Sequence, residues 1–90
     1  MPARGHFIAI EGPDGAGKTT QATALAEHLR ASGVDVLMTR EPGGTRLGER
    51  LREVLMAGTR SEAPNDPLTD ALLFNAARRQ LVTEVIRPAL

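Results

Sequence analysis

The sequence predicts an α/β fold in which helices flank a parallel sheet. Residues 7–10 form an uninterrupted apolar run, which is typical of a strand that is covered on both faces. A glycine-rich loop follows directly, and after it apolar residues recur at helical spacing. A strand, a loop and a helix in this order make the first unit of such a fold.

The loop, GPDGAGKTT at residues 12–20, fits the pattern G-x-x-x-x-G-K-[S/T], in which backbone N–H groups surround the phosphates of a nucleoside triphosphate. Lys18 supplies a positive charge to the phosphates, and the Thr19 hydroxyl is placed to bind Mg²⁺. A glycine-rich turn without a ligand is the alternative, which the flanking strand and helix patterns disfavour. We therefore expect a P-loop NTPase with ATP as co-substrate, Mg²⁺ as cofactor and Lys18 as a catalytic residue. The expected ATP-binding residues are Gly12, Pro13, Asp14, Gly15, Ala16, Gly17, Lys18, Thr19 and Thr20.

Two strands and three helices are expected in all. Residues 6–11 form the first strand, an apolar stripe begins the first helix after the loop, and Gly33 is suited to end it. Residues 34–39 form the second strand. Because a helix rather than a hairpin turn connects the two strands, we expect them to be parallel. The stripe consists of Ala22, Leu25, Ala26 and Leu29.

Residues 40–45 follow the second strand. Ligand-contacting residues gather at the carboxyl ends of strands in open α/β sheets, so this loop is expected at the sheet edge that carries the phosphate loop. A solvated Pro-Gly-Gly turn is the alternative. Thr45 is placed to cap the second helix. In that helix the expected buried stripe is Leu47, Leu51, Val54 and Leu55, and Arg46, Glu49, Arg50 and Glu53 are expected to face solvent.

A loop is expected over residues 57–66, and it leads into the third helix at residues 68 to about 87. Asp66 and Pro67 are typical of an N-cap and a first helical residue. Arg78 stands out because a buried guanidinium on an apolar helix face needs a partner. That partner is either an acidic residue or a ligand alongside the ring of Phe74. The face consists of Phe74, Arg78, Leu81 and Val85, and a neighbouring face holds Leu68, Leu72 and Ile86.

Composition excludes several classes of partner. Eleven basic and eleven acidic residues give no net charge, so no overall basic field favours nucleic acid or a membrane surface. The sequence has no cysteine and hence no disulfide framework. No signal-like or membrane-spanning apolar segment is found. We therefore expect a cytoplasmic protein that binds neither nucleic acid nor membrane.

Four blocks of the sequence resemble the N-terminal part of bacterial thymidylate kinases. They are GPDGAGKTT at 12–20, TREPGGT at 39–45, GERLREVL at 48–55 and LLFNAARRQLV at 72–82, which leads into VIRPAL. The phosphate loop alone indicates only a P-loop NTPase, whereas REPGGT combined with F-x-x-x-R is far more specific. The resemblance covers about residues 7–90. It implies a nucleoside monophosphate kinase-like fold and phosphoryl transfer from ATP to dTMP, giving dTDP for dTTP biosynthesis.

The resemblance also implies how the thymidine part of dTMP would be bound. Phe74 would stack on the thymine ring, and Arg78 would hydrogen-bond the base. Asp14 would contact the 3′-hydroxyl of the deoxyribose. Gly15 stands where some members carry an arginine, so an arginine from a lid would take that role.

For the dTMP phosphate, the resemblance implies that Arg40, Glu41 and Arg52 would surround the phosphate and its metal. Arg40 is thus a second catalytic candidate, and Glu41 a second candidate ligand of Mg²⁺. The peptide bond before Pro42 is implied to be cis. Pro42 completes the expected dTMP-binding set of Asp14, Arg40, Glu41, Pro42, Arg52, Phe74 and Arg78.

Against this family, residues 1–90 are expected to be the N-terminal part of a single P-loop kinase domain. The central strand with its Asp-Arg motif, the lid and the adenine-binding segment are not among them, and in the usual sheet order that strand lies between the first two. We therefore expect the chain to be inactive alone and the full-length protein to be a homodimer. The alternatives are another nucleoside or nucleoside monophosphate kinase, and a non-catalytic nucleotide-binding fragment.

Overall fold

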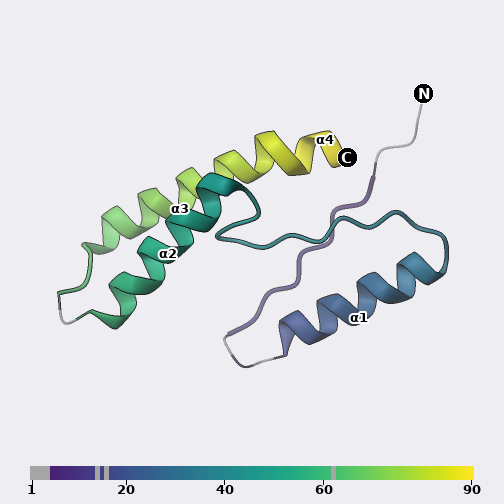
Figure 1. Cartoon of the computed structure of the whole chain (residues 1–90), viewed down its shortest axis with the longest axis horizontal. Helices are drawn as coiled ribbons and strands as arrows, with labels where there is room; N and C mark the ends of the chain where they lie inside the picture. The colour runs from purple at the N-terminus through teal and green to yellow at the C-terminus, as the bar shows by residue number, and fades with distance from the viewer. Residues whose placement is uncertain (1–4, 14, 16, 62) are drawn as a thin grey trace. The chain divides into compact units, whose positions relative to one another are not determined.

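The computed structural model describes residues 5–13, 15, 17–61 and 63–90. The chain divides into two compact units, Met1–Met38 and Thr39–Leu90. Figure 1 shows helix α1 in the first unit and helices α2, α3 and α4 in the second.

Helix α1, Lys18–Ala31, confirms the first predicted helix. Its end is set by Gly33, whose φ of 86° lies in the left-handed region that glycine adopts without strain. The Gly33 N–H donates to the Arg30 carbonyl and the Val34 N–H to the Leu29 carbonyl, both at 3.0 Å. These two bonds form a Schellman motif, so the carbonyls at the end of the helix are satisfied as the sequence predicts.

The two predicted strands are not present as strands. Residues 6–11 and 34–39 carry no strand assignment, and among the described residues no backbone hydrogen bond joins the two segments. The prediction of two strands is therefore not confirmed. A strand is stabilised by hydrogen bonds to a neighbour, and in the usual sheet order a third strand separates these two segments. The apolar side chains of Phe7 and Ile8 are accordingly exposed.

In the second unit, helices α2, Arg46–Arg60, and α3, Pro67–Leu81, form an antiparallel hairpin (Figure 1). The predicted caps are confirmed at both helix starts. The Thr45 hydroxyl accepts the Gly48 N–H at 2.9 Å, and the Asp66 carboxylate accepts the Thr69 N–H at 3.1 Å. Each cap satisfies an N–H group that has no partner within its helix.

The core of this hairpin is small. Leu55 on α2 and Ala77 and Leu81 on α3 are buried. Leu81 also packs against the loop before α2, because a Cβ built at Gly44 would lie 2.6 Å from its Cδ1. The core thereby ties the loop at residues 40–44 to α3.

Helix α2 runs farther than predicted, so the loop that follows it is shorter than residues 57–66. The helix continues to Arg60, and the Thr59 hydroxyl donates to the Met56 carbonyl at 2.8 Å. Gly58 lies within this last turn, where a Cβ would be 2.8 Å from Asn65 Nδ2. Gly58 is thus the place where the returning chain comes close to the helix.

The third helix changes its hydrogen-bond pattern near its end. After α3 the chain continues as a π-helical turn, η1, at Val82–Ile86, and then as α4 at Arg87–Ala89. Pro88 explains the change, because in an α-helix its ring would clash with the carbonyl four residues earlier, at Glu84. The wider π turn contains Glu84 and accommodates the proline. The predicted continuous α-helix to about residue 87 is thus corrected to a helix with a π turn.

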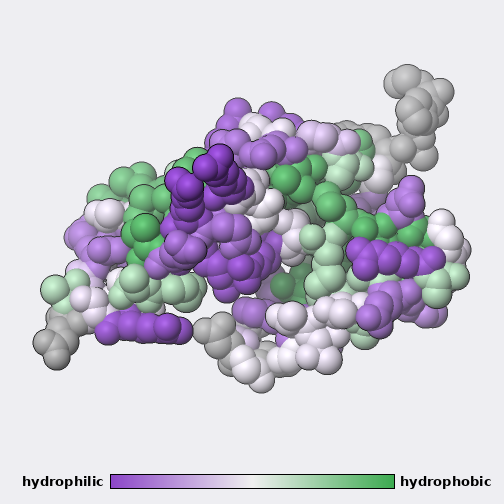
Figure 2. Space-filling view, in the orientation of Figure 1, coloured by the Kyte–Doolittle hydropathy of each residue, from purple (hydrophilic) through white to green (hydrophobic). Residues whose placement is uncertain are grey.

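Several large apolar side chains of the hairpin face outward, where Figure 2 shows green surface over α2 and α3. Leu47 and Val54 were expected in the buried stripe of α2 but are about half exposed. Leu68 and Leu72 on α3 are 67% and 64% exposed. Each helix of the hairpin is covered on one side by the other helix. The apolar stripe predicted on each helix is therefore wider than the surface that this contact buries. Within the described residues, no helix combines the length and apolarity needed to cross a membrane.

Candidate functional site

The glycine-rich loop of the first unit has the backbone that its sequence predicts at two positions. Gly15 and Gly17 have φ values of 82° and 80°, and a Cβ at either would meet open space. Glycine is therefore required here by backbone conformation rather than by crowding. Asp14 and Ala16, two predicted nucleotide-binding residues, lie outside the described residues.

Lys18 begins α1 and folds back over the loop. Its Nζ donates to the Gly12 carbonyl at 2.8 Å, so the ammonium group is held beside the loop backbone. Thr19 and Thr20 follow in the first helical turn and are exposed, and Pro13 is exposed as well. That turn contains no acidic side chain to oppose a bound anion. The described part of the loop thus combines a lysine with a helix N-terminus.

The predicted Mg²⁺ site requires oxygen ligands beside the phosphate loop. Mg²⁺ in nucleotide sites takes one or two protein oxygens together with phosphate oxygens and waters. The Thr19 hydroxyl, exposed in the first turn of α1, fits such a role. Among the described residues, no group of three His, Cys, Asp or Glu side chains could hold a metal. Thr19 is therefore the candidate Mg²⁺ ligand that the described part of this loop provides.

In the second unit the 40–44 loop contains two of the three predicted phosphate-binding residues, Arg40 and Glu41. The Glu41–Pro42 peptide bond is cis, as the resemblance implies. Pro42 is buried, and its carbonyl accepts a hydrogen bond from Arg52 Nη1 at 3.0 Å. Arg52 therefore reaches from α2 to this loop, and it is partly buried.

Arg40 makes a two-point ion pair with Glu49 on α2. Arg40 Nε donates to Glu49 Oε1 at 3.1 Å, and Nη2 donates to Oε2 at 2.7 Å. The Gly44 N–H donates to the same Oε1 at 3.3 Å. The hydrogen bonds from Arg40 and then from Gly44 lower the pKa of Glu49, and the bond to Glu49 raises the pKa of Arg40. Glu49, which was expected to face solvent, thus binds two residues of the 40–44 loop.

Arg78 is paired, but it is not buried as the sequence pattern predicts. Its side chain is 52% exposed, because it projects from the rim of α3 rather than from the core face. Its Nε and Nη2 donate to the Glu41 carboxylate, the shortest distance being 2.7 Å from Nη2 to Oε2. The guanidinium carbon lies 5.3 Å from the centroid of the Phe74 ring, a cation–π distance. Of the two expected partners of Arg78, the acidic residue is present as Glu41, and the Phe74 ring beside which a ligand was expected also lies next to the guanidinium.

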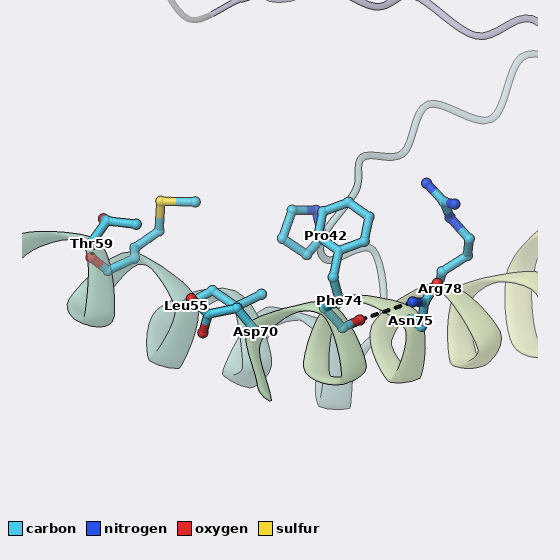
Figure 3. A pocket seen from close by; sticks show the side chains of 9 residues that line it. Pro42, Leu55, Thr59, Asp70, Phe74, Asn75 and Arg78 are labelled. Atoms are coloured by element: carbon cyan, nitrogen blue, oxygen red, sulfur yellow. Dashed lines mark hydrogen bonds between the residues drawn. The ribbon is translucent and has the colours of Figure 1, made fainter. Parts of the chain in front are cut away.

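A groove of about 500 Å³ runs between α2 and α3, and we refer to it as the α2–α3 groove (Figure 3). Its volume is typical of small-molecule pockets. Figure 3 shows Phe74 and Arg78 projecting from α3 on the side where Pro42 lies. Most of the lining is apolar. The lining residues are Pro42, Leu55, Met56, Thr59, Asp70, Ala71, Phe74, Asn75 and Arg78.

The predicted site residues of the second unit therefore fall into two groups. Pro42, Phe74 and Arg78 line the groove. Arg40 and Arg52 instead join the 40–44 loop to α2. Arg40 belongs to the loop and binds Glu49 on α2, and Arg52 belongs to α2 and binds the Pro42 carbonyl. Glu41 joins the groups through its pair with Arg78.

Sequence reasoning missed Glu49 and the polar groove residues Thr59, Asp70 and Asn75. Glu49 lies in the block GERLREVL that carries part of the resemblance, which is a usable signal. The three groove residues stand on helices where polar side chains usually face solvent, so the sequence offers no comparable signal for them.

Comparison with known proteins gives one consistent family. Residues 10–90 match the family model described as thymidylate kinase. A Pseudomonas fluorescens protein named thymidylate kinase is 57% identical over 86 residues, which cover 96% of this chain and 40% of that protein. Proteins of the same name from Deinococcus radiodurans and Thermomicrobium roseum are 53% and 60% identical, over 98% and 93% of this chain. These matches cover 41% and 38% of the two relatives, so the chain spans about 40% of the length of these relatives.

Proposed function

Since this chain belongs to the thymidylate kinase family, which implies the P-loop NTPase fold, we propose that it carries the donor phosphate loop and acceptor pocket of a dTMP kinase. The reaction is transfer of the γ-phosphoryl group of ATP to dTMP, giving ADP and dTDP. The observation that carries the proposal is the placement of Phe74 and Arg78 in one groove, with Arg40 on the adjoining loop and Arg52 reaching that loop from α2.

The acceptor assignment is supported by the chemistry of the groove. An aromatic ring beside a guanidinium suits a flat pyrimidine, since the ring stacks and the guanidinium donates to carbonyl oxygens. Phe74 and Arg78 provide that pair. Arg40 and Arg52 provide the positive charge that a monophosphate requires. In the proposed complex the base enters the groove and the phosphate lies near the 40–44 loop, with Asp14 at the deoxyribose.

The donor assignment is supported by the described part of the phosphate loop. Gly15 and Gly17 have the backbone needed for N–H groups to face an anion, and Lys18 lies against the same loop. Thr19 would hold Mg²⁺, with Glu41 a weaker candidate because its carboxylate is bound to Arg78. The metal, when bound, would neutralise charge on the phosphates. Lys18 and Arg40 would orient donor and acceptor and stabilise charge on the transferred group.

Substrate preference tests the proposal. ADP production by the full-length protein is measured in a coupled assay while dTMP, dUMP, dCMP and AMP are titrated in turn. The expected result is the highest kcat/KM for dTMP. Preference for another nucleotide would indicate a different monophosphate kinase and would refute the proposed roles of Phe74 and Arg78.

The chain of 90 residues on its own is proposed to be inactive, because the lid and the adenine-binding segment of such a kinase are not in it. The same assay on this polypeptide is expected to give no dTMP-dependent ADP. Measurable turnover would refute this part of the proposal. A homodimer and a cytoplasmic location for the full-length protein remain predictions from the sequence.

A further inference from the structure

Glu49 stands out because a single carboxylate is bound by a predicted catalytic arginine and by the loop that carries it. We propose that Glu49 is a positioning residue, which holds Arg40 and the Gly43–Gly44 turn ready to receive the phosphate of the acceptor nucleotide. This inference rests on the proposed function. It assigns a role to a residue of α2 that would not itself touch the nucleotide.

The contacts of Glu49 restrict both the side chain and the backbone before it. Its two oxygens take two donors of Arg40, at 3.1 and 2.7 Å, which fixes the plane of the guanidinium as well as its distance. Its Oε1 also accepts the Gly44 N–H. An arginine with one hydrogen bond could pivot, whereas the two-point pair leaves it a single orientation.

The turn is built closely around this carboxylate. Gly43 and Gly44 have φ values of 142° and 80°, which side-chain-bearing residues rarely adopt. A Cβ at Gly43 would lie 2.9 Å from Glu49 Oε1. The two glycines therefore let the backbone approach the carboxylate, and Glu49 in turn defines the path of the loop.

The pair leaves Arg40 able to bind an anion. A guanidinium has five N–H donors, and Glu49 takes one on Nε and one on Nη2, so three remain. The two side chains are 57% and 43% exposed, and ion pairs that exposed add little to folding stability. The consequence of the pair is therefore the orientation of Arg40 more than the stability of the fold.

The test uses Glu49→Gln and Glu49→Asp in the full-length protein, with Glu53→Gln as the matched control. Glu53 is exposed one turn farther along α2. We expect Glu49→Gln to raise the KM for dTMP roughly tenfold while the KM for ATP changes less than about twofold. Glu49→Asp, which keeps the charge on a shorter side chain, should give an intermediate increase, and Glu53→Gln should match the wild type.

A second measurement separates positioning from general structural damage. If Glu49 acts through Arg40, then Glu49→Gln should weaken calorimetric dTMP binding in the wild-type background and have little further effect when Arg40→Ala is already present. Additive effects, equal increases in both KM values, or an unchanged KM for dTMP would overturn the inference. Wild-type protein that does not phosphorylate dTMP would instead refute the proposed function, so the two failures are distinguishable.

Discussion

Glu41 and Arg78 lie 37 residues apart in the sequence and form an ion pair in which Arg78 Nη2 is 2.7 Å from Glu41 Oε2. The pair joins the 40–44 loop to α3. Because both side chains are partly exposed, we expect it to add only about 0–1 kcal/mol to stability. Its larger consequence is geometric, since it holds the loop next to the helix that carries Phe74.

Arg78→Ala tests the acceptor side of the site. The substitution removes a charged donor beside the Phe74 ring, and losing a charged hydrogen bond to the base should cost about 2 kcal/mol of dTMP binding, or roughly 30-fold in affinity. Calorimetric titration of the full-length protein with dTMP measures the change. Arg79→Ala, at the exposed neighbouring position, is the control and should bind normally. Equal affinities for the two variants would contradict the proposed role.

Lys18→Ala tests the donor side. Lys18 is the only lysine of the sequence, and its Nζ lies beside the phosphate loop. We expect turnover to be abolished while the dissociation constant for dTMP changes little, because all the proposed acceptor residues except Asp14 lie between residues 40 and 78. The coupled assay and dTMP titration provide the two measurements. His28→Ala, at an exposed position of the same helix, should leave both unchanged. Loss of dTMP binding with surviving ATP hydrolysis would mean that the roles are misassigned.

The pH dependence of stability tests the Arg40–Glu49 pair. The pKa of Glu49 is lowered in the folded protein, so its contribution is fully present above the ordinary glutamate pKa of about 4.3 and is lost as the pH falls through the lower folded value. Because the pair is exposed, we expect the wild type to have only a slightly higher Tm than Glu49→Gln at pH 7, and the difference to shrink as the pH falls below about 4.3. Thermal unfolding followed by circular dichroism measures this. If the difference in Tm between the two proteins did not change with pH, the ionised Arg40–Glu49 pair could not be the cause of that difference.

Gly44→Ala tests the construction of the loop. An alanine there would have an unfavourable φ of 80°, and its Cβ would run into Thr39 Oγ1 and lie 2.6 Å from Leu81 Cδ1. Gly33→Ala is the matched control, because Gly33 has a similar φ of 86° but open space around it. We expect Gly33→Ala to cost about 1 kcal/mol of unfolding free energy and Gly44→Ala about 1–3 kcal/mol more. Urea unfolding of both variants provides the values, and equal losses would show that the loop can relax.

The helices could be predicted from sequence because their signals are local. Thr45 and Asp66 each satisfy an N–H group three residues ahead, and Gly33 supplies the conformation that ends α1. The phosphate-loop motif and the F-x-x-x-R spacing are local in the same sense. The helices and the two motifs could therefore be predicted without knowing how the chain packs. The motifs in turn predicted the family to which the chain belongs.

Strand pairing and side-chain partners depend instead on which segments meet in space. Residues 6–11 have the composition of a strand, yet a strand also needs a neighbour with which to share hydrogen bonds. Arg40 pairs with Glu49 and Arg78 pairs with Glu41 because of the path that the 40–44 loop takes between α2 and α3. Since that path is a property of packing over tens of residues, periodicity and motif spacing carry no information about it.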